Sequence, residues 1–103
     1  MPGFSKQIAH PRTQDDAVER VRDFVGGVKR KYGDLASEVT GEWVRNQLEF
    51  SVTALGMRVQ GKLSLVDYLA HVEVKYPFAA AFFAGRIEDT ITRELQEALA
   101  LES

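Results

Sequence analysis

Two histidines and a few carboxylates are the side chains in this sequence that could carry out acid–base chemistry. His71 and Glu73 lie two residues apart, and this spacing places both on one face of a β-strand. A histidine beside a carboxylate can act as a general acid or base, but the sequence supplies no third partner for this pair. His10 lies just before Pro11, in a segment without clear periodicity. We therefore interpret His71 as a solvated strand residue and assign no catalytic residue.

Short motifs that bind phosphates or metals are absent from the sequence. It contains no glycine-rich phosphate loop, no HExxH zinc motif and no GxSxG nucleophile motif. The neighbouring Asp15 and Asp16 are explained by the start of a helix, where the helix dipole favours acidic side chains. Because the chain has no cysteine, disulfides and thiolate metal sites are excluded. We predict neither a bound metal nor a cofactor.

The basic run Lys29–Lys31 is the best candidate for a contact with phosphate groups. Acidic neighbours such as Asp23 and Asp34 dilute its charge, and the formal net charge of the chain is −2. Proteins that bind nucleic acids usually present a basic surface that neutralises several phosphates. We therefore do not expect nucleic acid as a partner.

Alternating residues in the middle of the chain predict the strands that must position any site. Between residues 48 and 76, three runs place apolar side chains at every second position, with polar side chains between them. This period indicates strands with one buried and one solvated face. A weaker first strand is expected over residues 35–40, with a turn at Gly41. The sequence thus predicts four strands.

Turn residues set the expected pairing of these strands. Residues 55–56, Leu-Gly, are typical of a two-residue hairpin turn and place Phe50 opposite Gly61. An aromatic ring over a glycine fills the space that the glycine leaves. Residues 66–67, Val-Asp, are a weaker turn signal and place Gly61 opposite Val72.

Two amphipathic helices flank the strands. Thr13 is expected to cap the first helix, whose apolar residues recur at helical spacing to about residue 32. The glycines at 26–27 lie inside this helix, and we interpret them as close packing of the helix on the sheet, with a kink as the alternative. The second helix is expected to begin at about Phe78 and to run for some 20 residues.

Together these elements predict one α+β domain. At 103 residues the chain has the length of a single domain. We expect residues 1–12 to form an extended lead-in and residues 13–101 to form the domain. The four strands would make an antiparallel meander with one apolar face. Because both helices need such a face, we predict a two-layer sandwich with the N-terminal and C-terminal helices on the same side.

An apolar segment at the start of the second helix is the strongest candidate for a contact surface. Residues 78–84 are apolar on all sides, and Phe82 lies about 180° from the core-facing side of the helix. Exposed apolar patches often mark sites of interaction. The candidate surface consists of Phe78, Phe82, Phe83 and Leu69. Coverage of these phenylalanines by residues 1–12 or by Leu69 is the alternative.

Composition and targeting signals indicate a cytoplasmic protein. No apolar run approaches the roughly 20 residues of a membrane-spanning helix. The N-terminus also lacks the hydrophobic region of a signal peptide. We therefore expect cytoplasmic residence and no membrane span.

Short motifs spread along the chain resemble a known family. They are Ala17-x-Glu19-Arg20-Val21, Lys31-Tyr32-Gly33, and Phe78 followed by Gly85-Arg86-Ile87-Glu88 at the start of a terminal amphipathic helix. With the alternating four-strand segment between them, residues 8–100 look like the putative polyhydroxyalkanoic acid system proteins. These are small bacterial proteins named for a genetic association with polyhydroxyalkanoate storage granules. The resemblance implies association with granules or their metabolism, and it carries over no catalytic residue.

We therefore expect a non-catalytic accessory or binding protein linked to storage-granule metabolism, located at the granule surface. Its apolar helix start, residues 78–83, would contact a granule or a granule protein. A carrier for a small apolar ligand is the first alternative, because a long helix laid across a curved sheet can leave a cavity. A self-associating module, such as a homodimer formed through the apolar patch, is the second alternative.

Overall fold

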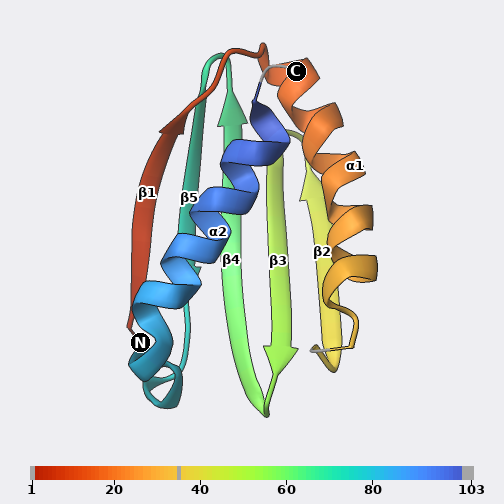
Figure 1. Cartoon of the computed structure of the whole chain (residues 1–103). Helices are drawn as coiled ribbons and strands as arrows, with labels where there is room; N and C mark the ends of the chain where they lie inside the picture. The colour runs from red at the N-terminus through yellow and green to blue at the C-terminus, as the bar shows by residue number, and fades with distance from the viewer. Residues whose placement is uncertain (1, 35, 101–103) are drawn as a thin grey trace.

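Within residues 2–34 and 36–100, which the computed structural model describes, five antiparallel strands form one sheet (Figure 1). Neighbouring strands lie in the order β1-β5-β4-β3-β2. Their bounds are β1 (Gly3–Ala9), β2 (Glu38–Val44), β3 (Gln47–Ala54), β4 (Met57–Val66) and β5 (Leu69–Lys75).

Two helices cover one face of this sheet, as the apolar faces of the elements predict (Figure 1). They are α1 (Gln14–Tyr32) and α2 (Ala84–Leu99), and the 3-10 helix η1 (Phe78–Phe83) leads directly into α2. The hydroxyl of Thr13 accepts a hydrogen bond from the Asp16 amide at 3.4 Å, which confirms the expected N-cap of α1. The predicted α+β architecture, with both helices on one side, is confirmed.

The predicted number of strands was wrong, because residues expected to form a lead-in add a fifth strand. β1 pairs antiparallel with β5 along its whole length. Phe4 and Ile8 pack against the core, but Lys6 lies between them on the same face and reaches Glu88 of α2 at 3.8 Å. This lysine breaks the apolar alternation that would have identified the strand. Residue 101, where we expected the domain to end, lies outside the described residues.

The first predicted turn was also misplaced. β2 continues through Gly41 to Val44, and the chain turns at residues 45–46, where Arg45 takes a φ of 57°. Asn46 is held there by β4, because its side-chain amide donates to the carbonyl of Leu65 at 2.6 Å. This contact is long-range, so local turn residues did not reveal it. Leu35, where the strand was expected to begin, lies outside the described residues.

The two later turns test the predicted strand registers. Leu55 and Gly56 form the β3–β4 turn with φ values of 54° and 74°, and Phe50 lies opposite Gly61 as predicted. The predicted β4–β5 register was wrong by two residues, because Gly61 pairs with Val74 and not with Val72. The turn lies at residues 67–68, one residue later than predicted.

Residues 10–14 set the position of this β4–β5 turn. The Asp67 carboxylate accepts a hydrogen bond from the Gln14 amide at 2.7 Å, and the Tyr68 amide donates to the Arg12 carbonyl at 2.8 Å. The observed register also pairs Lys62 with Glu73, which have opposite charges.

The hydrophobic core lies between the inner face of the sheet and the two helices. Its fully or nearly fully buried members are Ile8, Ala17, Val21, Leu48, Leu63, Leu65, Ala70, Val72, Val74, Tyr76, Ala80, Leu95 and Leu99. Five of these residues, Leu63, Leu65, Ala70, Val72 and Val74, lie on β4 and β5. Interpreting Gly26 and Gly27 as close packing was wrong, because a Cβ on either glycine would meet no neighbouring atom within 4 Å.

The open surroundings of these two glycines generate a prediction about stability. Replacing both Gly26 and Gly27 by Ala should raise the free energy of unfolding by about 1–2 kcal/mol, because each glycine disfavours a helix interior by about 1 kcal/mol relative to alanine. Urea unfolding of the double variant and the wild type measures this difference. A loss of stability would instead show that α1 needs the backbone freedom of the glycines.

Candidate functional site: an apolar cavity and its rim

An apolar cavity of about 530 Å³ lies between the two helices and the inner face of β2, β3 and β4. Most of the side chains that line it are aliphatic or aromatic. The sheet contributes Val39, Thr40, Leu48, Phe50, Val52, Ala54, Leu55, Met57, Val59 and Leu63. The helical side contributes Val21, Phe24, Val25, Val28, Ala36, Ala80, Phe83, Arg86, Ile87, Thr90, Ile91, Glu94 and Leu95.

The cavity exists because the two helices meet at one end of the sheet and separate toward the other. In Figure 1 the beginning of α1 and the end of α2 lie together at the top, and the helices diverge toward the β3–β4 turn at the bottom. Side chains of β3 and β4 between the diverging helices therefore have less helix above them. The sequence predicted two helices on one face but not the angle between them.

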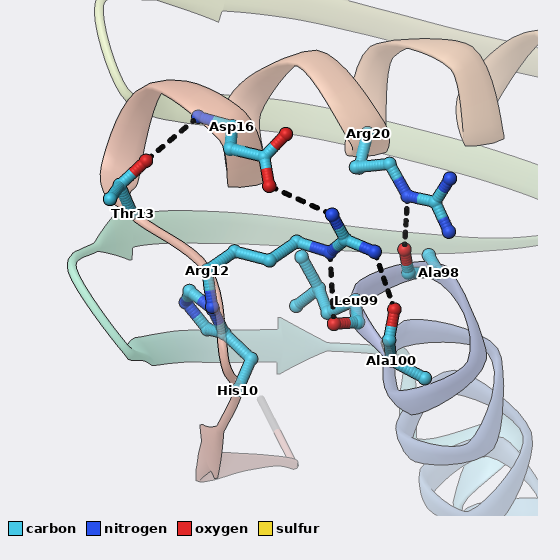
Figure 2. A network of polar contacts seen from close by, with 8 residues as sticks. All are labelled: His10, Arg12, Thr13, Asp16, Arg20, Ala98, Leu99 and Ala100. Atoms are coloured by element: carbon cyan, nitrogen blue, oxygen red, sulfur yellow. Dashed lines mark hydrogen bonds and ion pairs between the residues drawn. The ribbon is translucent and has the colours of Figure 1, made fainter. Parts of the chain in front are cut away.

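Arg12 joins the two helices where they meet (Figure 2). Its guanidinium donates to the carbonyls of Leu99 at 3.1 Å and Ala100 at 2.6 Å, and to the carboxylate of Asp16 at 2.8 Å. The last carbonyls of a helix have no partner within the helix and lie at the negative end of its dipole. Arg12 thus ends α2 and ties it to the first turn of α1.

Neighbouring side chains complete this junction. Arg20 of α1 donates to the carbonyl of Ala98 at 3.3 Å. The nearly buried His10 accepts from the Arg12 amide through Nδ1, which leaves Nε2 to donate to the Val66 carbonyl at 3.1 Å. His10, which sequence analysis left in a segment without clear periodicity, is therefore a structural residue of the junction.

Exposure of the lining side chains shows which end of the cavity is closed and which is open. Leu48, Leu63 and Leu95 are buried and form its inner end. At the other end Leu55 is 87% exposed and Phe83 is 43% exposed. These two residues, with the exposed Arg86, form the mouth of the cavity.

Within the sheet, Phe50 and Gly61 form part of the floor of the cavity. A Cβ added at Gly61 would overlap the Phe50 ring, so the ring lies flat across the glycine. The predicted cross-strand pair is therefore present. Because the Phe50 ring lies against the backbone of Gly61, it takes up less of the space between the sheet and the helices.

The few polar side chains of the lining differ in whether they have a hydrogen-bond or ion-pair partner. The carboxylate of Glu94 is nearly buried and forms an ion pair with Lys31 of α1 at 2.9 Å. Among the described residues, Arg86 has no hydrogen-bond or ion-pair partner, and neither has the hydroxyl of Thr90. Arg86 and Thr90 are four residues apart on α2 and therefore lie on the same side of the helix. The sequence did not identify Arg86 as a lining residue, because Arg86 lies on the polar side of the amphipathic pattern of this helix.

Three of the four residues of the predicted contact surface lie together. Phe78 is 81% exposed and Phe82 is 92% exposed, and the ring of Phe83 meets that of Phe82 edge to face at 5.7 Å between centroids. Neither residues 2–12 nor Leu69 covers Phe78 and Phe82. Leu69 begins β5, whereas η1 follows the other end of that strand, so it does not join this apolar rim of Phe78, Phe82 and Phe83.

Near His71 the structure adds a third polar group that the sequence did not reveal. Ser5 of β1 lies 3.2 Å from His71 Nε2, and the Glu73 carboxylate lies 3.4 Å from the same nitrogen. A nucleophile–base–acid relay needs the hydroxyl and the carboxylate on different ring nitrogens. Here Nδ1 is buried and has no partner among the described residues. This geometry does not form a relay, and the absence of catalysis stays a prediction.

Among residues 2–34 and 36–100, no group of three or more His, Cys, Asp or Glu side chains lies close enough to hold a metal ion. In the same part of the chain, no helix has both the length and the apolar character needed to cross a bilayer.

Comparisons with known proteins add a family and a fold. The family model described as putative polyhydroxyalkanoic acid system protein matches residues 7–99. No curated protein matches the sequence. Among solved structures, the chain is similar to that described as the di-domain ARO/CYC BexL from the BE-7585A biosynthetic pathway, with a TM-score of 0.56 and 10% identity. The match covers 99% of this chain and 51% of that one, so the chain spans about half the length of BexL. At this identity the likeness shows the fold alone.

The junction between the helices generates the second prediction. Arg12→Gln should lower the free energy of unfolding by about 2 kcal/mol, because hydrogen bonds made by a charged group contribute roughly 1.5–3 kcal/mol. Arg93→Gln is the matched control, since Arg93 is an exposed arginine of α2 with no ion pair in the described part of the chain. Urea unfolding compares the two variants. Equal stabilities would show that the Arg12 contacts contribute nothing measurable.

Proposed function

Because this chain belongs to the family of putative polyhydroxyalkanoic acid system proteins, we propose that it is a non-catalytic binding protein of polyhydroxyalkanoate granules. The observation that supports this proposal is the apolar rim, in which two phenylalanines are more than four-fifths exposed. Large exposed apolar side chains gathered at one end of a small domain are typical of contact surfaces. A polyester granule offers an apolar surface that would bury them.

The size of the rim suggests how strong such a contact would be. Full burial of a phenylalanine side chain contributes about 1.5–3 kcal/mol, so Phe78 and Phe82 together would supply roughly 3–6 kcal/mol. Immobilising a protein opposes binding by a comparable or larger amount. A single molecule would therefore bind reversibly, and a granule protein at the surface would strengthen the contact.

Granule co-sedimentation tests this proposal. Replacing Phe78 and Phe82 by Ser should reduce the affinity for granules at least about tenfold, since more than 1.4 kcal/mol of burial is lost. Val44→Ser is the control, because Val44 is 54% exposed but ends β2 at the opposite end of the sheet (Figure 1). Unchanged co-sedimentation of the double variant would contradict the proposal.

Two additional measurements separate the possible partners. Binding to native granules but not to protein-free polymer particles would identify a granule protein as the partner. Sedimentation equilibrium of the wild type and Phe82→Ser examines the alternative of a homodimer, which stays a prediction. A wild-type dimer that becomes a folded monomer on substitution would assign the rim to self-association.

A carrier for a small apolar ligand is the second candidate function, and the cavity supports it. Its volume of about 530 Å³ lies within the range of roughly 300–1,000 Å³ that small-molecule pockets occupy. A lining that is mostly apolar with a few polar groups is also typical of such pockets. A solidly packed core without a cavity would have contradicted this function.

A cavity-filling variant tests the carrier function. Val59→Phe places a ring in the cavity from β4, so binding of the neutral fluorescent probe N-phenyl-1-naphthylamine should fall about tenfold or more. Stability should stay equal or rise, as cavity filling commonly does. Val66→Phe makes the same change at the end of β4, outside the cavity lining, and should bind the probe like the wild type. Equal probe affinity for both variants would place the probe elsewhere.

A further inference from the structure

We propose that the cavity binds a single-chain amphiphile with a carboxylate head group, whose chain lies along α2 and whose head group contacts Arg86 at the mouth. This inference rests on the carrier function proposed above. It adds the chemical class of the ligand and the residue that recognises it.

Arg86 is the group that would recognise the carboxylate head. It lines the mouth of the cavity, and it has no carboxylate partner in the described part of the chain. Guanidinium groups bind carboxylates in a bidentate manner through two parallel hydrogen bonds. The Thr90 hydroxyl lies on the same side of α2 and supplies one more donor beside this position.

Charges elsewhere in the lining favour an anionic rather than a cationic head group. The other ionisable side chain of the lining is Glu94, and its carboxylate is nearly buried and paired with Lys31 at 2.9 Å. A cationic head group would therefore meet an unpaired arginine at the mouth and an already neutralised carboxylate inside. An anionic head group gains a partner without disturbing this ion pair.

Along α2 the cavity has the length to hold an apolar chain. Arg86 lies at the mouth and Leu95 at the closed inner end, nine residues further along the helix. Nine residues of α-helix span about 14 Å, which accommodates a chain of medium length. Ile87 and Ile91 lie between these two ends and present branched aliphatic side chains to such a chain.

Three ligands with the same ten-carbon chain separate the head-group inference from the carrier function. Decanoate, decanol and decyltrimethylammonium are used to displace N-phenyl-1-naphthylamine from wild type, Arg86→Gln and Arg93→Gln at neutral pH. The wild type is expected to bind decanoate at least about tenfold more tightly than decanol, and the cationic amphiphile most weakly. Arg86→Gln should remove the preference for decanoate, and Arg93→Gln should keep it.

Each result has a distinct meaning. Equal affinity of the wild type for decanoate and decanol, or a preference that survives in Arg86→Gln, would overturn the inference and leave the carrier function standing. Failure of the wild type to bind the probe and all three ligands would overturn the carrier function as well. Because Arg86 is exposed, the variant should remain folded, and its urea unfolding curve checks this.

Discussion

The contact of Arg12 with the last carbonyls of α2 is the constraint on which the arrangement of the helices depends. A helix end leaves carbonyls without partners, and a guanidinium satisfies two of them here while also binding Asp16 of α1. This contact joins the helices at the beginning of α1 and the end of α2, and the Lys31–Glu94 ion pair connects them again from the last turn of α1. Since both must also cover a twisted sheet, they separate as they leave this junction.

The cavity follows from that separation. Where the helices meet, their side chains and those of β4 and β5 form a closed core around Leu63, Val72 and Leu99. Where they diverge, the inner-facing side chains of β3 and β4 are only partly buried, and the Phe50 ring lies against Gly61. The same sheet therefore supplies a packed core at one end and a ligand-sized cavity at the other.

Both proposed contact sites lie at the diverging end. η1 carries the exposed phenylalanines and leads directly into the helix that carries Arg86. Leu55 holds an exposed apolar side chain in a turn with positive φ, at the mouth of the cavity. A granule surface contacted through the apolar rim would thus lie next to the mouth of the cavity, so binding at the granule and uptake of a small amphiphile are compatible.

What the sequence alone determined are the features that depend on local pattern: the alternating strands, the β3–β4 turn with Phe50 over Gly61, the Thr13 cap and the two amphipathic helices. Its motifs also identified the family. Tertiary structure decided the rest, because those features depend on contacts between distant segments. β1 needed β5, the turn at residues 67–68 needed residues 10–14, and the exposure of Phe82 depended on which segments failed to cover it. Arg86 became a candidate ligand contact only because the packing of α2 over the sheet places this residue in the lining of the cavity.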